Sequence, residues 1–79
     1  MNKMKLHAKL IDMGVVEEND VVVIKETKGY YPSVYITVVT GLNKVASYTY
    51  QDNELVIIEG SVHLSNVLRM KDLDLEEFE

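Results

Sequence analysis

Four short runs of β-branched and aromatic residues, separated by turn sequences, most constrain what this chain of 79 residues can fold into. The runs are VVVIKET (21–27), VYITVVT (34–40), VASYTY (45–50) and LVIIE (55–59). They recur at about ten-residue spacing and are joined by loops of hairpin length. This pattern predicts a small antiparallel meander of four to five strands, open or closed into a barrel, in which VHL (62–64) is a short fifth strand.

The N-terminal stretch KMKLHAKLIDMG (3–14) allows two interpretations. Its first eight residues alternate between polar and apolar as in a half-buried strand, but Met, Lys, Leu and Ala are strong helix formers. Gly14 followed by the apolar Val15 suits a helix stop, and the sheet needs a cover. We therefore predict a short N-terminal helix, with a strand as the alternative, in a mainly β α+β fold that spans residues 1–79 as one domain.

Residue parity along the strands predicts which faces are buried. Val34, Ile36 and Val38 share an aliphatic face, which we expect to be the core side of the sheet. Nearly every position of LVIIE (55–59) is apolar, so we expect a central strand that is covered on both faces. A terminal helix or a partner subunit would supply the second cover.

The C-terminal stretch SNVLRM (65–70) predicts a helical turn capped by Ser65 or Asn66. The acidic residues that follow oppose the helix dipole. We therefore expect the chain to fray after about Leu75.

Composition excludes several classes of function. The chain has no cysteine, which rules out disulfides and thiolate metal sites. Its net charge of −5 disfavours direct binding to a nucleic-acid backbone. No apolar run approaches the roughly 20 residues that span a bilayer. We expect a cytoplasmic protein that does not associate with membranes.

Catalytic residues are sparse. His7 and His63 are the only histidines, and no metal-binding or nucleophile motif surrounds either of them. The four glycines are scattered and form no phosphate-binding loop. We expect neither enzymatic activity nor a metal or cofactor.

Tyrosines supply five of the six aromatic residues. Two lie in the loop around Pro32, and parity assigns the other three to strand faces opposite the aliphatic layer. The set is Tyr30, Tyr31, Tyr35, Tyr48 and Tyr50. Because tyrosine gives a large contact area at low entropic cost, we predict a non-catalytic module that binds a protein partner through a Tyr-bearing sheet face. The alternative is that the rings cap the core.

Acidic residues allow a second hypothesis. They are Glu17, Glu18, Asp20, Asp52, Glu54, Asp72 and Asp74. If these converge on one side, the chain could act as an inhibitor of the phage or mobile-element type, which occupies the nucleic-acid-binding site of a host enzyme by charge mimicry. A third hypothesis is a structural homo-oligomer, in which a second subunit covers the strand at 55–59.

Two segments resemble parts of a known family. NDVVVIKETKG (19–29) and VHLSNVLRM (62–70) are similar to the first and last pieces of KOW-type barrels, the small five-stranded Src-homology-like barrels of ribosomal and transcription-elongation proteins. Asp20 and the Lys28-Gly29 turn match the family's opening motif. The resemblance implies a barrel-like sheet. It does not imply RNA binding, because family members that bind RNA are basic and this chain is acidic.

Overall fold

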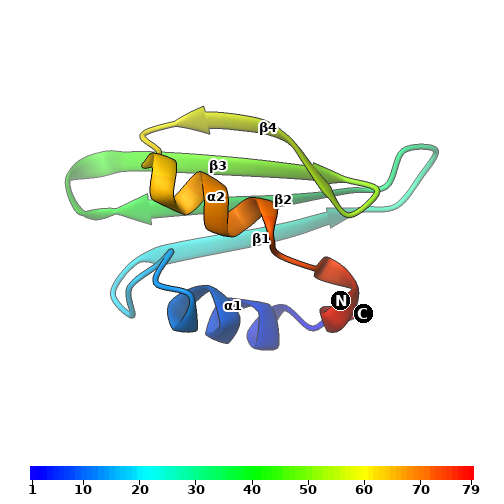
Figure 1. Cartoon of the computed structure of the whole chain (residues 1–79), viewed down its shortest axis with the longest axis horizontal. Coiled ribbons are helices and arrows are strands. Elements are labelled where there is room, and N and C mark those ends of the chain that lie inside the picture. Colours follow the sequence, from blue (N-terminus) through cyan, green and yellow to red (C-terminus); the bar gives the residue numbers. More distant parts are fainter.

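A computed structural model shows an open, four-stranded antiparallel sheet with helices on one face (Figure 1). The structure describes residues 1–79, except for the side chain of Leu42. In chain order the elements are α1 (Lys3–Asp12), β1 (Val21–Thr27), β2 (Ser33–Thr40), the 3₁₀ turn η1 (Gly41–Asn43), β3 (Lys44–Gln51), β4 (Glu54–Gly60), α2 (Leu64–Lys71) and the 3₁₀ turn η2 (Leu75–Phe78). The predicted α+β meander is confirmed, and its sheet is open rather than closed into a barrel.

The predicted N-terminal helix is confirmed as α1. Leu6 and Leu10 lie four residues apart and are both fully buried, so the helix presents one apolar stripe to the sheet. Gly14 has φ +78°, and the backbone N–H of Val15 donates to the carbonyl of Leu10 at 3.0 Å. This geometry is the Schellman stop that the sequence predicts. Among the described residues, no helix is both long enough and apolar enough to cross a membrane.

The hydrophobic core fills the space between the sheet and the helices. Ile36 and Val38 of β2 are buried in it, which confirms the predicted aliphatic face. The remaining buried apolar residues are Leu6, Leu10, Val15, Val16, Tyr48, Tyr50, Met70, Leu73, Leu75 and Phe78.

The predicted face of Tyr48 and Tyr50 is wrong. The β2–β3 register pairs Ile36 with Tyr48 and Val34 with Tyr50, and directly paired residues share a face. Both tyrosines therefore lie on the core side, where each is 1% exposed. Parity within a strand defines two faces, but only the register shows which face of one strand continues onto the next.

The predicted position of β4 is also wrong. It pairs with β3 alone and forms one edge of the sheet (Figure 1). Its residues Val56, Ile57 and Ile58 remain 39–46% exposed instead of being covered on both faces. A bulge opposite Thr49 and Tyr50 interrupts the pairing, which changes the parity along the strand.

The C-terminal segment is more ordered than the sequence predicts. There is no fifth strand at residues 62–64, because α2 begins at Leu64 with His63, rather than Ser65 or Asn66, as its N-cap. The expected fraying after Leu75 is wrong as well. Leu75 and Phe78 are 4% and 2% exposed, so their burial holds η2 against the rest of the core.

Gly60 ends β4 in a conformation that other residues rarely adopt. Its φ is +88°, and a Cβ placed there would lie 2.1 Å from the carbonyl oxygen of Val45. The same carbonyl accepts a hydrogen bond from the backbone N–H of Ser61 at 2.8 Å. A side chain at position 60 would therefore fit only if the backbone at Val45 moved.

We expect Gly60→Ala to lower the free energy of unfolding by about 2 kcal/mol or more, because it combines a positive φ with a backbone clash. Gly29→Ala is the matched control, since a Cβ at Gly29 meets nothing within 4 Å. Urea unfolding of both variants measures the difference. Equal stability of the two variants would contradict this account of Gly60.

Tyr50 joins the sheet to α2. Its hydroxyl donates to the backbone carbonyl of Met70 at 2.8 Å inside the core. Burial, together with the proximity of Tyr48, raises the pKa of Tyr50 above its usual value of 10.0. The folded state therefore opposes ionisation of this hydroxyl, whereas the unfolded chain permits it.

Tyr50→Phe is expected to lower the free energy of unfolding by about 1 kcal/mol at neutral pH, because the carbonyl of Met70 loses its shortest hydrogen bond and keeps only backbone donors such as the N–H of Leu73 at 3.3 Å. As the pH rises above 10.0, the wild type should lose stability progressively, since only the unfolded chain then releases the proton of Tyr50. The variant should lose less over the same range. Parallel alkaline unfolding curves for the two proteins would disprove the coupling.

Candidate binding cleft

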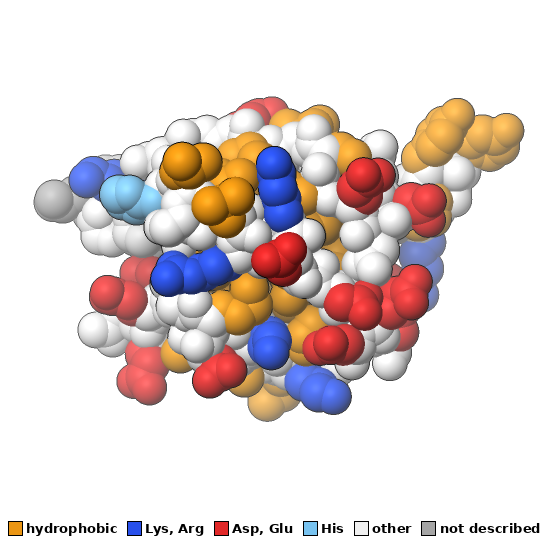
Figure 2. Space-filling model, in the orientation of Figure 1, with side chains coloured by type: hydrophobic (Ala, Val, Ile, Leu, Met, Phe, Trp, Pro, Cys, Tyr) orange, Lys and Arg blue, Asp and Glu red, His pale blue; other side chains and the backbone are white. Residues whose placement is uncertain are grey.

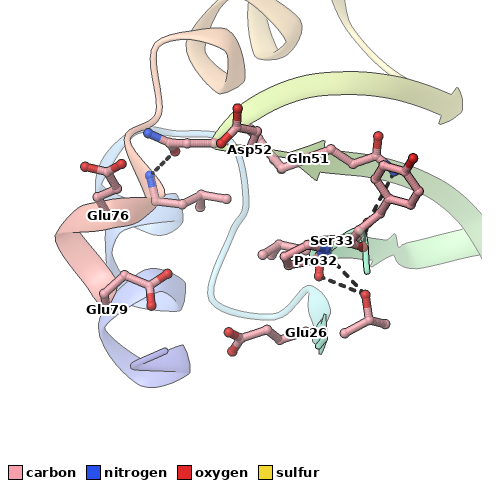
Figure 3. Close-up of a pocket in the computed structure, with 13 residues that line it drawn as sticks. Glu26, Pro32, Ser33, Gln51, Asp52, Glu76 and Glu79 are labelled. Carbon is pink, nitrogen blue, oxygen red and sulfur yellow. Dashed lines mark hydrogen bonds between the residues drawn. The ribbon is translucent and has the colours of Figure 1, made fainter. Parts of the chain in front are cut away.

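A cleft of about 520 Å³ opens at one end of the sheet (Figure 3). Three parts of the chain enclose it: the end of β1 with the loop that leads to β2, the turn between β3 and β4, and η2. Val34, Tyr50 and Leu75 lie at its base, where Tyr50 and Leu75 are almost fully buried, and Tyr31 and Pro32 supply its exposed apolar surface. The cleft thus forms where strand ends and the buried C-terminal turn meet.

Asn53 fastens one wall of the cleft. It occupies the β3–β4 turn with φ 60°, next to Asp52 with φ 53°, as expected for a two-residue hairpin turn. Its side-chain amide donates to Oδ1 of Asp74 at 2.8 Å. Its Oδ1 accepts from the backbone N–H of Leu75, also at 2.8 Å. One side chain therefore holds η2 against the end of the sheet.

Ser33 fastens the opposite wall. Its backbone N–H donates to Oγ1 of Thr27 at 3.2 Å, and its hydroxyl donates to the carbonyl of Tyr31 at 3.2 Å. The side-chain amide of Gln51 in turn donates to the Ser33 hydroxyl at 3.3 Å. These bonds fix the base of the loop that carries Tyr31 and Pro32 along the cleft.

The charge of the cleft is one-sided. Glu26, Asp52, Glu76 and Glu79 contribute carboxylates to its lining, and the described lining residues include no Lys, Arg or His (Figure 3). The N-terminal amino group of Met1 lies 3.6 Å from Oε2 of Glu26, and this is the one ion pair within the part of the chain that the structure describes. The site is therefore suited to a cationic group with an apolar stem.

Tyr30 and Tyr31 form an exposed aromatic pair beside the cleft. Their ring centroids are 5.0 Å apart with an interplanar angle of 77°, an edge-to-face arrangement. They are 91% and 74% exposed. The loop that carries them projects beyond the end of the sheet, where Figure 2 shows a hydrophobic protrusion. Tyr31 also lines the cleft, so the pair extends its apolar surface outward.

The structure does not bring the five predicted tyrosines onto one face. Tyr30 and Tyr31 lie in the exposed loop, whereas Tyr35 is half-buried on the sheet face away from the helices. Tyr48 and Tyr50 are in the core, where Tyr50 also reaches the cleft lining. The alternative, that tyrosine rings cap the core, holds for this last pair.

The seven predicted acidic residues do not form one surface either. Glu17, Glu18 and Asp20 precede β1 at one end of the sheet, whereas Asp52 and its neighbours lie at the other. Figure 2 shows acidic side chains toward both ends, with Lys and Arg between them. The charge-mimicry hypothesis requires convergence on one side, and this arrangement does not meet that requirement.

Three carboxylates of the cleft were missed by the sequence reasoning. Glu26 could have been found, because it continues the inward parity of Val22 and Ile24 and so places a charge on the core face at a strand end. Glu76 and Glu79 lie in the segment after Leu75 that the sequence predicts to fray. No local signal indicates that η2 packs against α1 and the β3–β4 turn, since the order of this turn depends on distant contacts.

Among the described side chains, no group of three or more His, Cys, Asp or Glu residues could hold a metal ion. Comparisons with protein-family models, with curated proteins and with solved structures find no match for this chain. The geometry of its own surfaces is therefore the basis for functional inference.

We expect Asn53→Gly to release η2, because glycine keeps the left-handed backbone but removes both side-chain hydrogen bonds. The free energy of unfolding should fall by about 1–2 kcal/mol, and the amide of Leu75 should exchange faster with solvent. Asp52→Gly is the matched control: it sits at the other positive-φ position of the same turn and makes no side-chain bond to η2. Equal exchange of Leu75 in both variants would show that Asn53 does not hold the wall.

Proposed function

We propose that this protein is a non-catalytic binding module that holds a basic segment of a partner protein in the cleft at the end of its sheet. The observation that carries this proposal is a cleft with four lining carboxylates, of which only Glu26 is paired with a cation among the described residues, next to apolar surface and an exposed aromatic pair. The protein partner and the tyrosine contacts are those that the sequence predicts. We place the contacts at the end of the sheet instead of on one of its faces.

A lysine or arginine side chain fits this site for physical reasons. Its aliphatic stem can lie along the exposed Pro32 and Tyr31 while its charged head reaches the carboxylates at the rim. An arginine can also bind a carboxylate with two parallel hydrogen bonds and stack on the ring of Tyr31. Arginine should therefore be preferred over lysine.

The affinity should be modest and sensitive to salt. Asp52, Glu76 and Glu79 are exposed, and an exposed ion pair contributes only about 0.2–1 kcal/mol. Several contacts must therefore act together, which favours a segment with more than one basic residue. Screening between exposed charges should weaken the complex as ionic strength increases.

The test is a titration of the isotopically labelled protein with a short peptide that contains two arginines, followed by NMR. Amide shifts are expected for the Tyr31 loop, the β3–β4 turn and η2. The same peptide with glutamine in place of arginine is the ligand control. Absence of binding up to about 1 mM peptide, a limit that corresponds to about −4 kcal/mol, would reject the proposal.

The paired substitution Glu76→Gln and Glu79→Gln should weaken binding of the arginine peptide by about tenfold, because it removes two carboxylates from the rim. Glu17→Gln with Glu18→Gln is the matched control, since it makes the same change in net charge at the opposite end of the sheet. An equal loss in both double variants would show that binding depends on overall charge and not on the cleft.

A further inference from the structure

No helix covers the sheet face away from α1 and α2 (Figure 1), although Ser33 and Thr49 on this face are only 4% and 6% exposed. We call it the open face. Its side chains alternate with those of the core, and Val21, Val39 and Val45 line up across three neighbouring strands. Ile57 of β4 belongs to the same face, and of these four residues only Val39 is not largely exposed. An exposed sheet face in water normally carries polar or charged side chains at these positions.

Charge on the open face is confined to the two edge strands. Lys25 lies on β1, and Glu54 and Glu59 lie on β4. The positions of the two central strands that share this face are uncharged: Ser33, Tyr35, Thr37, Val39, Val45, Ser47, Thr49 and Gln51. None of the three charged groups forms an ion pair with another described side chain. The face is therefore neutral in its centre, basic on one edge and acidic on the other.

We infer that the open face docks onto the open face of a second copy of this chain, with a two-fold axis parallel to the strands. Rotation about that axis lays β1 of one protomer over β4 of its partner. Lys25 of one protomer then lies opposite the part of β4 between Glu54 and Glu59 in the second protomer. The two-fold symmetry gives an identical contact at the other edge. A two-fold axis across the strands would instead lay β1 on β1, which brings the two copies of Lys25 together. The distribution of charge thus selects one arrangement.

The size of the face sets the strength of this dimer. Four strands at a spacing of about 4.8 Å, each about seven residues long, make a face of roughly 400 Å². A standard interface buries about 800 Å² on each partner, so the dimer should be weak and should dissociate in the micromolar to millimolar range. The two sheets should pack nearly aligned, at the angle of about 30° that their twist imposes.

Analytical ultracentrifugation of the wild type from low micromolar to about 1 mM tests the inference, since a weak interface of this size should associate within that range. The mass should approach twice the monomer value of 9.0 kDa. Lys25→Glu should weaken the dimer by about tenfold, because it places like charges at both edges. A wild type that remains monomeric throughout would overturn the inference.

Charge exchange distinguishes this arrangement from any other self-association. Glu54→Lys with Glu59→Lys should weaken the dimer as Lys25→Glu does, and combining all three substitutions should restore it to within a few-fold of the wild type. Restoration also shows that the variants fold. Failure of the combined variant to recover, while its circular dichroism matches the wild type, would overturn the proposed axis.

Val45→Glu tests the centre of the face. It should abolish association at all accessible concentrations, whereas Leu64→Glu, on the exposed side of α2, should leave it unchanged. A dimer that tolerates Val45→Glu would associate through a strand edge instead, and would overturn the inference.

Discussion

Tyr50 makes the buried interaction that joins the C-terminal segment of this structure to its sheet. It lies on β3, its ring is in the core, and it donates to the carbonyl of Met70 near the end of α2. The same side chain contributes to the apolar lining of the cleft. A small domain buries only about 60% of its unfolded surface. A single contact that joins the sheet, α2 and the cleft therefore contributes a larger share of the stability than it would in a larger core. Loss of this bond is expected to loosen the C-terminal segment before it affects the central strands, which are held by their own pairing.

Local signals are sufficient for the four strands and α1, and insufficient for the C-terminal elements and for how the elements pack on one another. The four strands, the helix α1 and its Gly14 stop follow from residue types and spacing within short windows. The side of the sheet that Tyr48 occupies depends on the register across η1, where Asn43 adopts a positive φ in a three-residue connection. That register is a property of two strands together, so parity in one of them does not contain it.

The difference between local and long-range contacts also explains which residues of the cleft the sequence predicts. Tyr31 and Asp52 were predicted as binding residues and do line the cleft, because exposed loops and turns are recognisable from their composition. Glu76 and Glu79 were not, because their position depends on the burial of Leu75 and Phe78 against residues far away in the sequence. The order of η2 is a tertiary effect. Its short local sequence would not hold a helical turn in isolation.

The two inferred surfaces share Ser33 and Gln51 at the strand ends, are otherwise distinct, and are related by geometry. The cleft lies at one end of the strands, whereas the open face runs along them. A two-fold axis parallel to the strands keeps the direction of the strands the same in both protomers, so equivalent ends of the two sheets lie side by side. Both clefts of such a dimer would therefore point the same way. Two weak sites held side by side bind a partner with two basic segments far more tightly than either site alone, because the second contact becomes intramolecular. The modest affinity that an exposed acidic cleft allows is thus compatible with firm binding to a repeated or multivalent partner. An axis across the strands would point the two clefts in opposite directions and would lose this gain, so the edge charges of the open face determine how the clefts are presented.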